Sequence, residues 1–146
     1  MTDALNSCQL TNEELIYALN ELLEAERAGA RVLLETAQQN PPENLAVQIN
    51  EIQRDEIRWC KMLINVIRSL DIVPSRKTGA FYEKAIAITN LKERLIFINR
   101  GQGWVVRRLS EIIPRMQDVN IRKQLEEMRD AHVDNIELVK KSLGET

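Results

Sequence analysis

The chain has 146 residues, of which 44% are hydrophobic and 29% are charged, and its formal net charge at pH 7 is −2. This slightly acidic composition argues against a nucleic-acid partner, which usually requires a basic surface. The chain also has no run of about 18 apolar residues, the length that is needed to cross a membrane. We expect a cytoplasmic protein, because there is no signal-peptide pattern and Cys8 and Cys60 do not resemble a disulfide framework. Residues 1–10 are expected to be a flexible tail and residues 11–146 a single domain.

The first half of the chain predicts two long helices. Thr11 and Glu14 have the spacing of a capping box, so the first helix is expected at about residues 11–39. The sequence "NPP" then ends this helix and begins the next one, because proline is favoured in a first helical turn. We expect the second helix to cover about residues 42–70.

The second half predicts a longer connection and two more long helices. The segment "AFYEKAIAI" indicates a short helix at about residues 79–88. A third long helix is expected at about 90–116, with Pro114 disturbing its last turn, and a fourth at about 120–143, stopped by Gly144. The fold class is therefore all-α: a four-helix bundle with a short extra helix in the connection between the second and third helices.

Each long helix has a core-facing seam that is apolar except for one residue near its middle. These polar residues are Glu26, Glu56, Gln102 and His132, and His132 is the only histidine of the chain. A buried carboxylate is costly unless it is paired, protonated or bound to a metal. We therefore expect one polar layer across the bundle, with Asn99 as an alternative to Gln102 in the third helix.

Two glycines flank Gln102, although each glycine inside a helix costs about 1 kcal/mol relative to alanine. Small residues at these positions either allow close helix packing against a tryptophan or leave space beside the polar layer. We expect the following residues to line a pocket there: Trp59, Cys60, Gly101, Gly103 and Trp104.

Three segments resemble the ferritin-like superfamily, the four-helix bundles of bacterioferritins and rubrerythrins. "LNELLEAERAGARVLL" resembles their first helix, with Glu26 at the metal-ligand position. "RDEIRWCKML" resembles the Glu-x-x-His segment of their second helix, with Glu56 as the glutamate, and "MRDAHVDNIELV" resembles their fourth helix, with His132 as the histidine. The chain is similar to a diverged bacterial subgroup of ferritin-like domains that occur alone or fused to DJ-1/PfpI-like domains, which implies a stress or redox context.

The di-iron motif that this resemblance implies is incomplete. Such a site takes one glutamate from each of two helices and Glu-x-x-His from each of the other two. Trp59 replaces the second-helix histidine, Arg129 replaces the fourth-helix glutamate, and the third helix offers an amide. Arg129 shares a helix face with His132, so we expect its guanidinium to pair with Glu56 or Glu26 and to take the place of the metal.

The sequence supports two main functions. The first is a non-catalytic module without a cofactor, which is structural, dimerising or binds a small-molecule ligand. The alternative is a mononuclear non-haem protein in which Glu26, Glu56 and His132 bind iron or another divalent metal for redox or oxygen chemistry. A third function, a reactive thiol at Cys60, requires that a nearby arginine lower the pKa of this thiol.

A homodimer is expected from a second apolar stripe on the first helix. Small residues within this stripe would suit close packing of a partner helix. The stripe consists of Leu15, Ala18, Leu22, Ala25, Gly29 and Val32.

Overall fold

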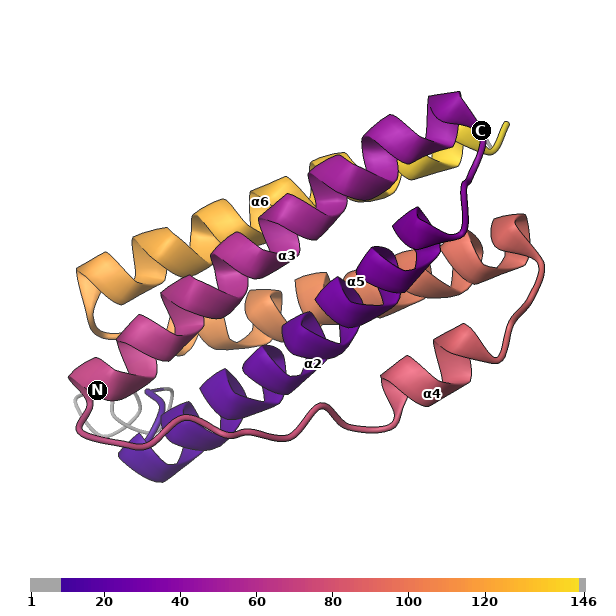
Figure 1. Cartoon of the computed structure of the whole chain (residues 1–146). Helices are drawn as coiled ribbons and strands as arrows, with labels where there is room; N and C mark the ends of the chain where they lie inside the picture. Colours follow the sequence, from indigo (N-terminus) through magenta and orange to yellow (C-terminus); the bar gives the residue numbers. More distant parts are fainter. Residues whose placement is uncertain (1–8, 145–146) are drawn as a thin grey trace.

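The computed structural model of the chain describes residues 9–144, which contain helices and connections but no strand. The helices are α2 (Asn12–Gln38), α3 (Glu43–Ser69), α4 (Phe81–Ile86), α5 (Leu91–Ile112) and α6 (Val119–Ser142), with a 3-10 turn, η1, at Ile113–Arg115. α2 packs along α3, α5 packs along α6, and α4 lies against α2 and α5 (Figure 1). The prediction of an all-α bundle is confirmed.

The long connection from α3 to α5 returns the chain along the length of the bundle. In Figure 1 it passes beside α2 before it reaches α4, so that α3 and α5 run in the same direction and α2 and α6 run opposite to them. Ser75 fastens the connection to α2, because its N–H donates to Asn20 Oδ1 and its hydroxyl donates to Glu24, each at 2.8 Å. Arg27 also donates to the carbonyl of Lys77 at 2.7 Å.

Local sequence features determine where the helices end. The capping box of α2 is present: the Glu14 N–H donates to Thr11 Oγ1, and the Thr11 N–H donates to the Glu14 carboxylate, both at 3.1 Å. α5 ends at Ile112 rather than near residue 116, because Pro114 has no N–H to donate and the chain tightens into η1. α4 is shorter than the predicted 79–88, because Gly79 has φ +70°, outside the helical region.

The core consists of two apolar clusters, one toward each end of the bundle. The first contains Leu19 of α2 and Leu63 of α3, and the second contains Leu33 of α2 and Ile49 of α3. On each long helix one buried polar residue falls between the residues of these two clusters. A polar layer therefore divides the apolar interior into two parts. Its members are Glu26, Glu56, Gln102 and His132.

The predicted tail lies mostly outside the described residues, as does Cys8. Leu10, its last residue, is bound to the bundle, since its N–H donates to the Arg115 carbonyl at 3.1 Å and its side chain packs against the first cluster. Within residues 9–144, no helix combines the length and the hydropathy that a membrane span requires.

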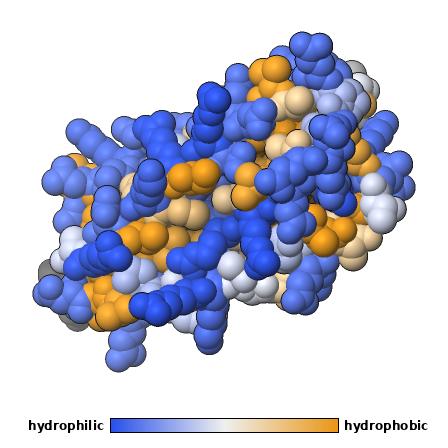
Figure 2. Space-filling view, viewed as in Figure 1, coloured by the Kyte–Doolittle hydropathy of each residue, from blue (hydrophilic) through white to orange (hydrophobic). Residues whose placement is uncertain are grey.

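The predicted dimer surface on the first helix is wrong. The stripe is covered within the chain itself, because α3, α4 and the long connection all pack on α2. Ala25 is half-buried against the first cluster, and the other five residues are buried: Leu15, Ala18, Leu22, Gly29 and Val32. The face of the molecule in Figure 2 is largely hydrophilic, and its apolar side chains form small patches between charged ones.

Candidate functional site

Three ionisable side chains from three helices meet at the middle of the bundle. Glu26 (α2), Glu56 (α3) and His132 (α6) each present one donor atom, and these atoms all lie within 4.8 Å of one another. Their exposed fractions are only 1%, 4% and 2%. Each lies on the apolar seam of its helix, so helical periodicity alone turns all three side chains inward.

His132 is oriented by its own helix. Its Nδ1 lies 2.8 Å from the carbonyl oxygen of Met128, one turn earlier in α6, and its Nε2 lies 2.6 Å from Oε1 of Glu26. A carbonyl oxygen can only accept a hydrogen bond, so Nδ1 carries a proton. Nε2 therefore faces the carboxylates and holds either a second proton or a lone pair that can bind a metal ion.

The pKa of His132 reflects opposing effects of its surroundings. Burial lowers this pKa, but the charge of Glu26, its hydrogen bond and the Met128 carbonyl outweigh burial, with a smaller contribution from the charge of Asp55. The net result is a pKa above the ordinary value for histidine. A proton at Nε2 is thus favoured beside Glu26.

Glu56 has no hydrogen bond or ion pair within residues 9–144, and its Oε2 is fully buried. Gly29 makes room for this side chain, since a Cβ at position 29 would lie 3.3 Å from the Glu56 carboxyl carbon and from Oε1. Gln102 is also buried, and neither its amide nitrogen nor its amide oxygen has a hydrogen-bond partner in the described part of the chain. Buried polar groups normally have partners, so this layer is suited to bind an additional ion or molecule.

A pocket of about 310 Å³ connects this layer with the surface. Glu26, Glu56 and Gln102 line its buried inner end. Its walls come from α2, from the end of the long connection at residues 78–80, from the start of α4 and from α5. Trp104, which is 36% exposed, lies at its outer part. The pocket therefore reaches Glu26, Glu56 and Gln102 of the polar layer from one side.

The prediction for Arg129 needs correction. Its guanidinium is partly exposed and lies 3.3 Å from its neighbour Asp130, so the ion pair it makes among the described residues is not with Glu56 or Glu26. The physical reason is that a helix face is wide: residues three apart share a face, but the long side chain of Arg129 reaches water at its edge. The Glu–Arg–His–Gln network predicted from the sequence is therefore absent from the core.

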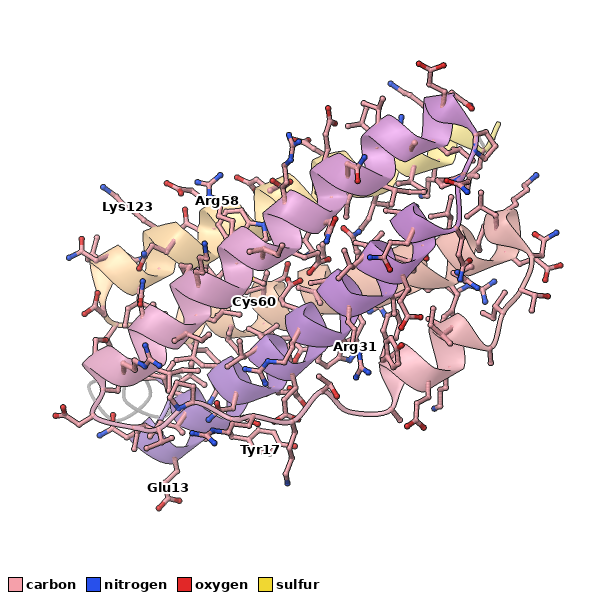
Figure 3. All side chains as sticks on the ribbon, in the orientation of Figure 1. Glu13, Tyr17, Arg31, Arg58, Cys60 and Lys123 are labelled. Carbon is pink, nitrogen blue, oxygen red and sulfur yellow. The ribbon has the colours of Figure 1, made fainter. Side chains whose placement is uncertain are left out.

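The predicted pocket residues separate into two groups. Gly101 and Trp104 line the pocket, whereas Gly103 lines a different groove on the surface between α5 and α6. Trp59 is buried in the first apolar cluster, with Arg58 stacked on its ring, and it is not among the lining residues. Cys60 is half-buried on α3, on the side facing α2 (Figure 3), and it does not line the pocket either.

The environment of Cys60 does not favour a reactive thiolate. Burial and the nearby charge of Glu26 raise the pKa of this thiol to about 12, and Arg27 lowers it only in part. The arginine effect that the thiol function requires is therefore outweighed. At neutral pH Cys60 remains a protonated, weakly nucleophilic side chain.

The alternative between Gln102 and Asn99 is decided by their surroundings. Gln102 is 4% exposed and reaches the pocket, whereas Asn99 is only half-buried and donates to the Ile136 carbonyl at 3.1 Å, on the α6 side of α5. Gln102 is therefore the residue of α5 in the polar layer.

Phe81 forms part of the pocket wall and was not among the predicted pocket residues. A Cβ on Gly101 would lie 2.8 Å from Cε2 of Phe81, so the glycine allows this ring to lie directly on the backbone of α5. The ring also stacks on Phe97, with centroids 5.1 Å apart. Helical periodicity carries no information on this contact, because it depends on how α4 docks.

A second missed residue is Arg94, which is 3% exposed at the start of α5. It donates to Ile88 O at 2.8 Å, to Gln39 Oε1 at 2.9 Å and to Thr36 Oγ1 at 3.1 Å. These bonds tie the residues after α4 to the end of α2. Near the start of α4, Arg31 of α2 (Figure 3) lies over the ring of Tyr82, 3.9 Å from its centroid.

A family model matches residues 13–141, which is most of the chain. This family is described as a domain of unknown function, DUF6306. No curated protein and no solved structure matches the chain. The comparisons therefore show the family of the chain but assign no chemistry to it.

Proposed function

Since the chain belongs to the DUF6306 family, whose function is not known, we propose a function from its site: a ferritin-like bundle that binds one divalent metal ion through Glu26, Glu56 and His132. The observation that carries this proposal is the convergence of three buried donor atoms, from three helices, within 4.8 Å. Burial of the two carboxylates would be costly without a cation to neutralise them.

The donor set fits a transition-metal ion. Two carboxylate oxygens and one imidazole nitrogen suit iron(II), manganese(II), cobalt(II) or zinc(II), and the charge of the two carboxylates balances that of the ion. Metal–ligand bonds of about 2.0–2.2 Å place two ligands of one ion at most about 4.4 Å apart. The three donor atoms lie within 4.8 Å of one another, so small side-chain movements would bring them around a single ion, with His132 Nε2 and Glu26 Oε1 separating from 2.6 Å. The Met128 carbonyl supports this, because it holds the proton of His132 on Nδ1 and directs Nε2 to the ion.

The residues present do not fit a second ion. Trp59 is buried in the apolar cluster at the position where the ferritin-like pattern has a histidine, and Arg129 points to Asp130 where the pattern has a glutamate. The resemblance itself is supported by the direction of the helices, because one long connection between the second and third long helices is typical of ferritin-like bundles (Figure 1).

A bound iron ion would supply redox or oxygen chemistry, which the stress or redox context implied by the resemblance would use. The chain itself would contribute space, a polar group and access from solvent. Gly29 leaves space beside Glu56, Gln102 offers an unpartnered amide on the same pocket, and the pocket leads from solvent to the layer. These features would leave one side of the ion open to a small molecule.

The second candidate function is a metal-free binding module, and the contact between His132 and Glu26 favours it. A protonated His132 at 2.6 Å from Glu26 would neutralise that carboxylate without a metal. A homodimer and a cytoplasmic location remain predictions, and sedimentation of the purified protein tests the first of them.

The experiment is a metal titration of protein freed of metal with a chelator and then dialysed. We expect one iron(II), manganese(II), cobalt(II) or zinc(II) ion per chain by calorimetry and elemental analysis, with iron titrated under anaerobic conditions. Glu56→Gln and His132→Gln should each weaken binding at least tenfold, because each removes one of three donors. Glu51→Gln, an exposed position on the same helix as Glu56, is the control and should bind as the unmodified protein does. Equal binding by all of these proteins, or none by the unmodified one, would refute the metal site.

A further inference from the structure

We propose that the pocket admits a small uncharged alcohol, an apolar molecule with one hydroxyl group, and holds its hydroxyl beside Gln102 and Glu56. This inference rests on the metal ion proposed above, because the ion determines the net charge at the inner end of the pocket. It assigns a class of ligand to a cavity that the metal site itself leaves open.

The walls of the pocket recognise an apolar body. Ala25, Phe81, Ile98, Gly101 and Val105 all contribute to its lining, and the volume of about 310 Å³ is at the lower limit of small-molecule sites, which is about 300 Å³. The aromatic ring of Phe81 is held in place by its stacking on Phe97. Binding to a wall of this composition is favourable, because it removes apolar surface of the ligand from water.

The inner end of the pocket requires a group that both donates and accepts hydrogen bonds. The amide nitrogen of Gln102 is an unpartnered donor, while its amide oxygen and Oε2 of Glu56 are unpartnered acceptors. All three atoms are buried although both residues line the pocket, so the proposed binding requires the two side chains to turn toward the ligand. A hydroxyl group can accept a hydrogen bond from the amide nitrogen and donate one to an oxygen at the same time. A hydrocarbon would leave these groups unsatisfied, which is unfavourable.

The charges around the pocket favour an uncharged ligand. Its lining includes the carboxylates of Glu21, Glu24, Glu26 and Glu56 and, in the described part of the chain, no lysine or arginine. A divalent ion would neutralise Glu26 and Glu56, so an organic anion would bring an unbalanced negative charge into a buried site. An organic cation would instead compete with the metal ion for the same two carboxylates.

The test uses four probes that share one body: benzyl alcohol, toluene, benzoate and benzylamine. Each is titrated into zinc-loaded, nitrogen-15-labelled protein, and the indole N–H signal of Trp104 reports binding because this residue lines the pocket. The chain has two tryptophans, so Trp104→Phe identifies the signal by removing it. We expect benzyl alcohol to shift this signal and to bind at least about tenfold more tightly than the other three probes, which corresponds to about 1.4 kcal/mol.

Two variants narrow the pocket, and one leaves it unchanged. Ala25→Leu adds volume within the pocket and Ala80→Trp adds volume at its rim, so each should reduce the affinity for benzyl alcohol at least fivefold while one zinc ion per chain still binds. Zinc binding shows that a variant is folded, and Ala80→Trp provides the test if Ala25→Leu does not fold. Gly103→Ala is the control, because position 103 lies on another groove and a Cβ there meets only Arg107 Nη1, at 3.5 Å.

The outcomes separate the two proposals. Zinc binding without a response of Trp104 to benzyl alcohol, or with equal affinity for toluene or tighter binding of benzoate or benzylamine, would overturn the alcohol site and leave the metal site standing. Absence of zinc binding would overturn the metal site, and with it the charge argument for an uncharged ligand. Zinc binding together with selective, variant-sensitive binding of benzyl alcohol would support both.

Discussion

The two glycines that flank Gln102 provide a matched test of how α4 is positioned. Gly101 and Gly103 lie in the same helix, two residues apart, and each lowers the helical stability of α5. A Cβ at position 101 would lie 2.8 and 2.9 Å from two ring carbons of Phe81, far inside normal contact distance. A Cβ at position 103 would meet only the end of a flexible arginine, at 3.5 Å. The same substitution should therefore have opposite consequences at the two positions.

The expected magnitudes follow from these contacts. Gly103→Ala should raise the free energy of unfolding by about 0.5–1 kcal/mol, which is the difference in helix propensity between the two residues. Gly101→Ala has the same gain in helix propensity, but the added methyl group must displace the Phe81 ring. Overpacking of this kind costs about 1–3 kcal/mol. Part of this cost is the loss of the stacking between Phe81 and Phe97. We therefore expect Gly101→Ala to be less stable than Gly103→Ala by about 1–3 kcal/mol.

Urea unfolding, followed by circular dichroism at 222 nm (a wavelength reporting helix), measures both variants against the unmodified protein, with roughly equal m values as a check of two-state behaviour. The Phe81→Ala background supplies the control, because Gly101→Ala should become about as favourable as Gly103→Ala once the ring is absent. If Gly101→Ala and Gly103→Ala have equal stability in the unmodified background, the docking of Phe81 on the backbone of α5 is wrong.

Two further predictions concern ionisation. Because the pKa of Cys60 is raised to about 12 from 9.0, its thiolate fraction at pH 8 should be about a thousandfold smaller in the folded than in the unfolded protein; iodoacetamide labelling of a Cys8→Ser variant, followed by mass spectrometry, should be correspondingly slow until urea is added. Similar labelling rates in both states would contradict the buried position of this thiol. In metal-free protein, the raised pKa of His132 means that the folded state binds more protons than the unfolded state above the ordinary histidine value of about 6.5, so stability should fall as pH rises through the folded pKa. Urea unfolding between pH 6 and pH 9 should show this fall in the unmodified protein but not in His132→Gln, and a parallel pH dependence of the two proteins would show that the Glu26 contact is not its source.

The sequence alone determined the helices and the residues that each helix turns inward. Helix ends depend on local groups, such as the capping box of Thr11 and Glu14 and the missing N–H of Pro114, so they can be identified without knowledge of the rest of the fold. The inward position of Glu26 and His132 follows from the spacing of apolar residues along their own helices, since the apolar face of a helix must be buried. The predicted helices therefore differ from the observed ones mainly by shortened ends.

Only the tertiary structure decided which of these inward residues share a cavity and which surfaces are covered. Periodicity assigns Arg129 to the face of His132, but the distance to neighbouring helices, and hence the direction of a long side chain, depends on how the helices pack. The pocket depends on the docking of α4 and of the connection before it, which have no periodic pattern to predict their position. For the same reason the sequence indicated that Gly101 and Gly103 were unusual, while only the position of Phe81 distinguished the glycine that the fold requires from the one it tolerates.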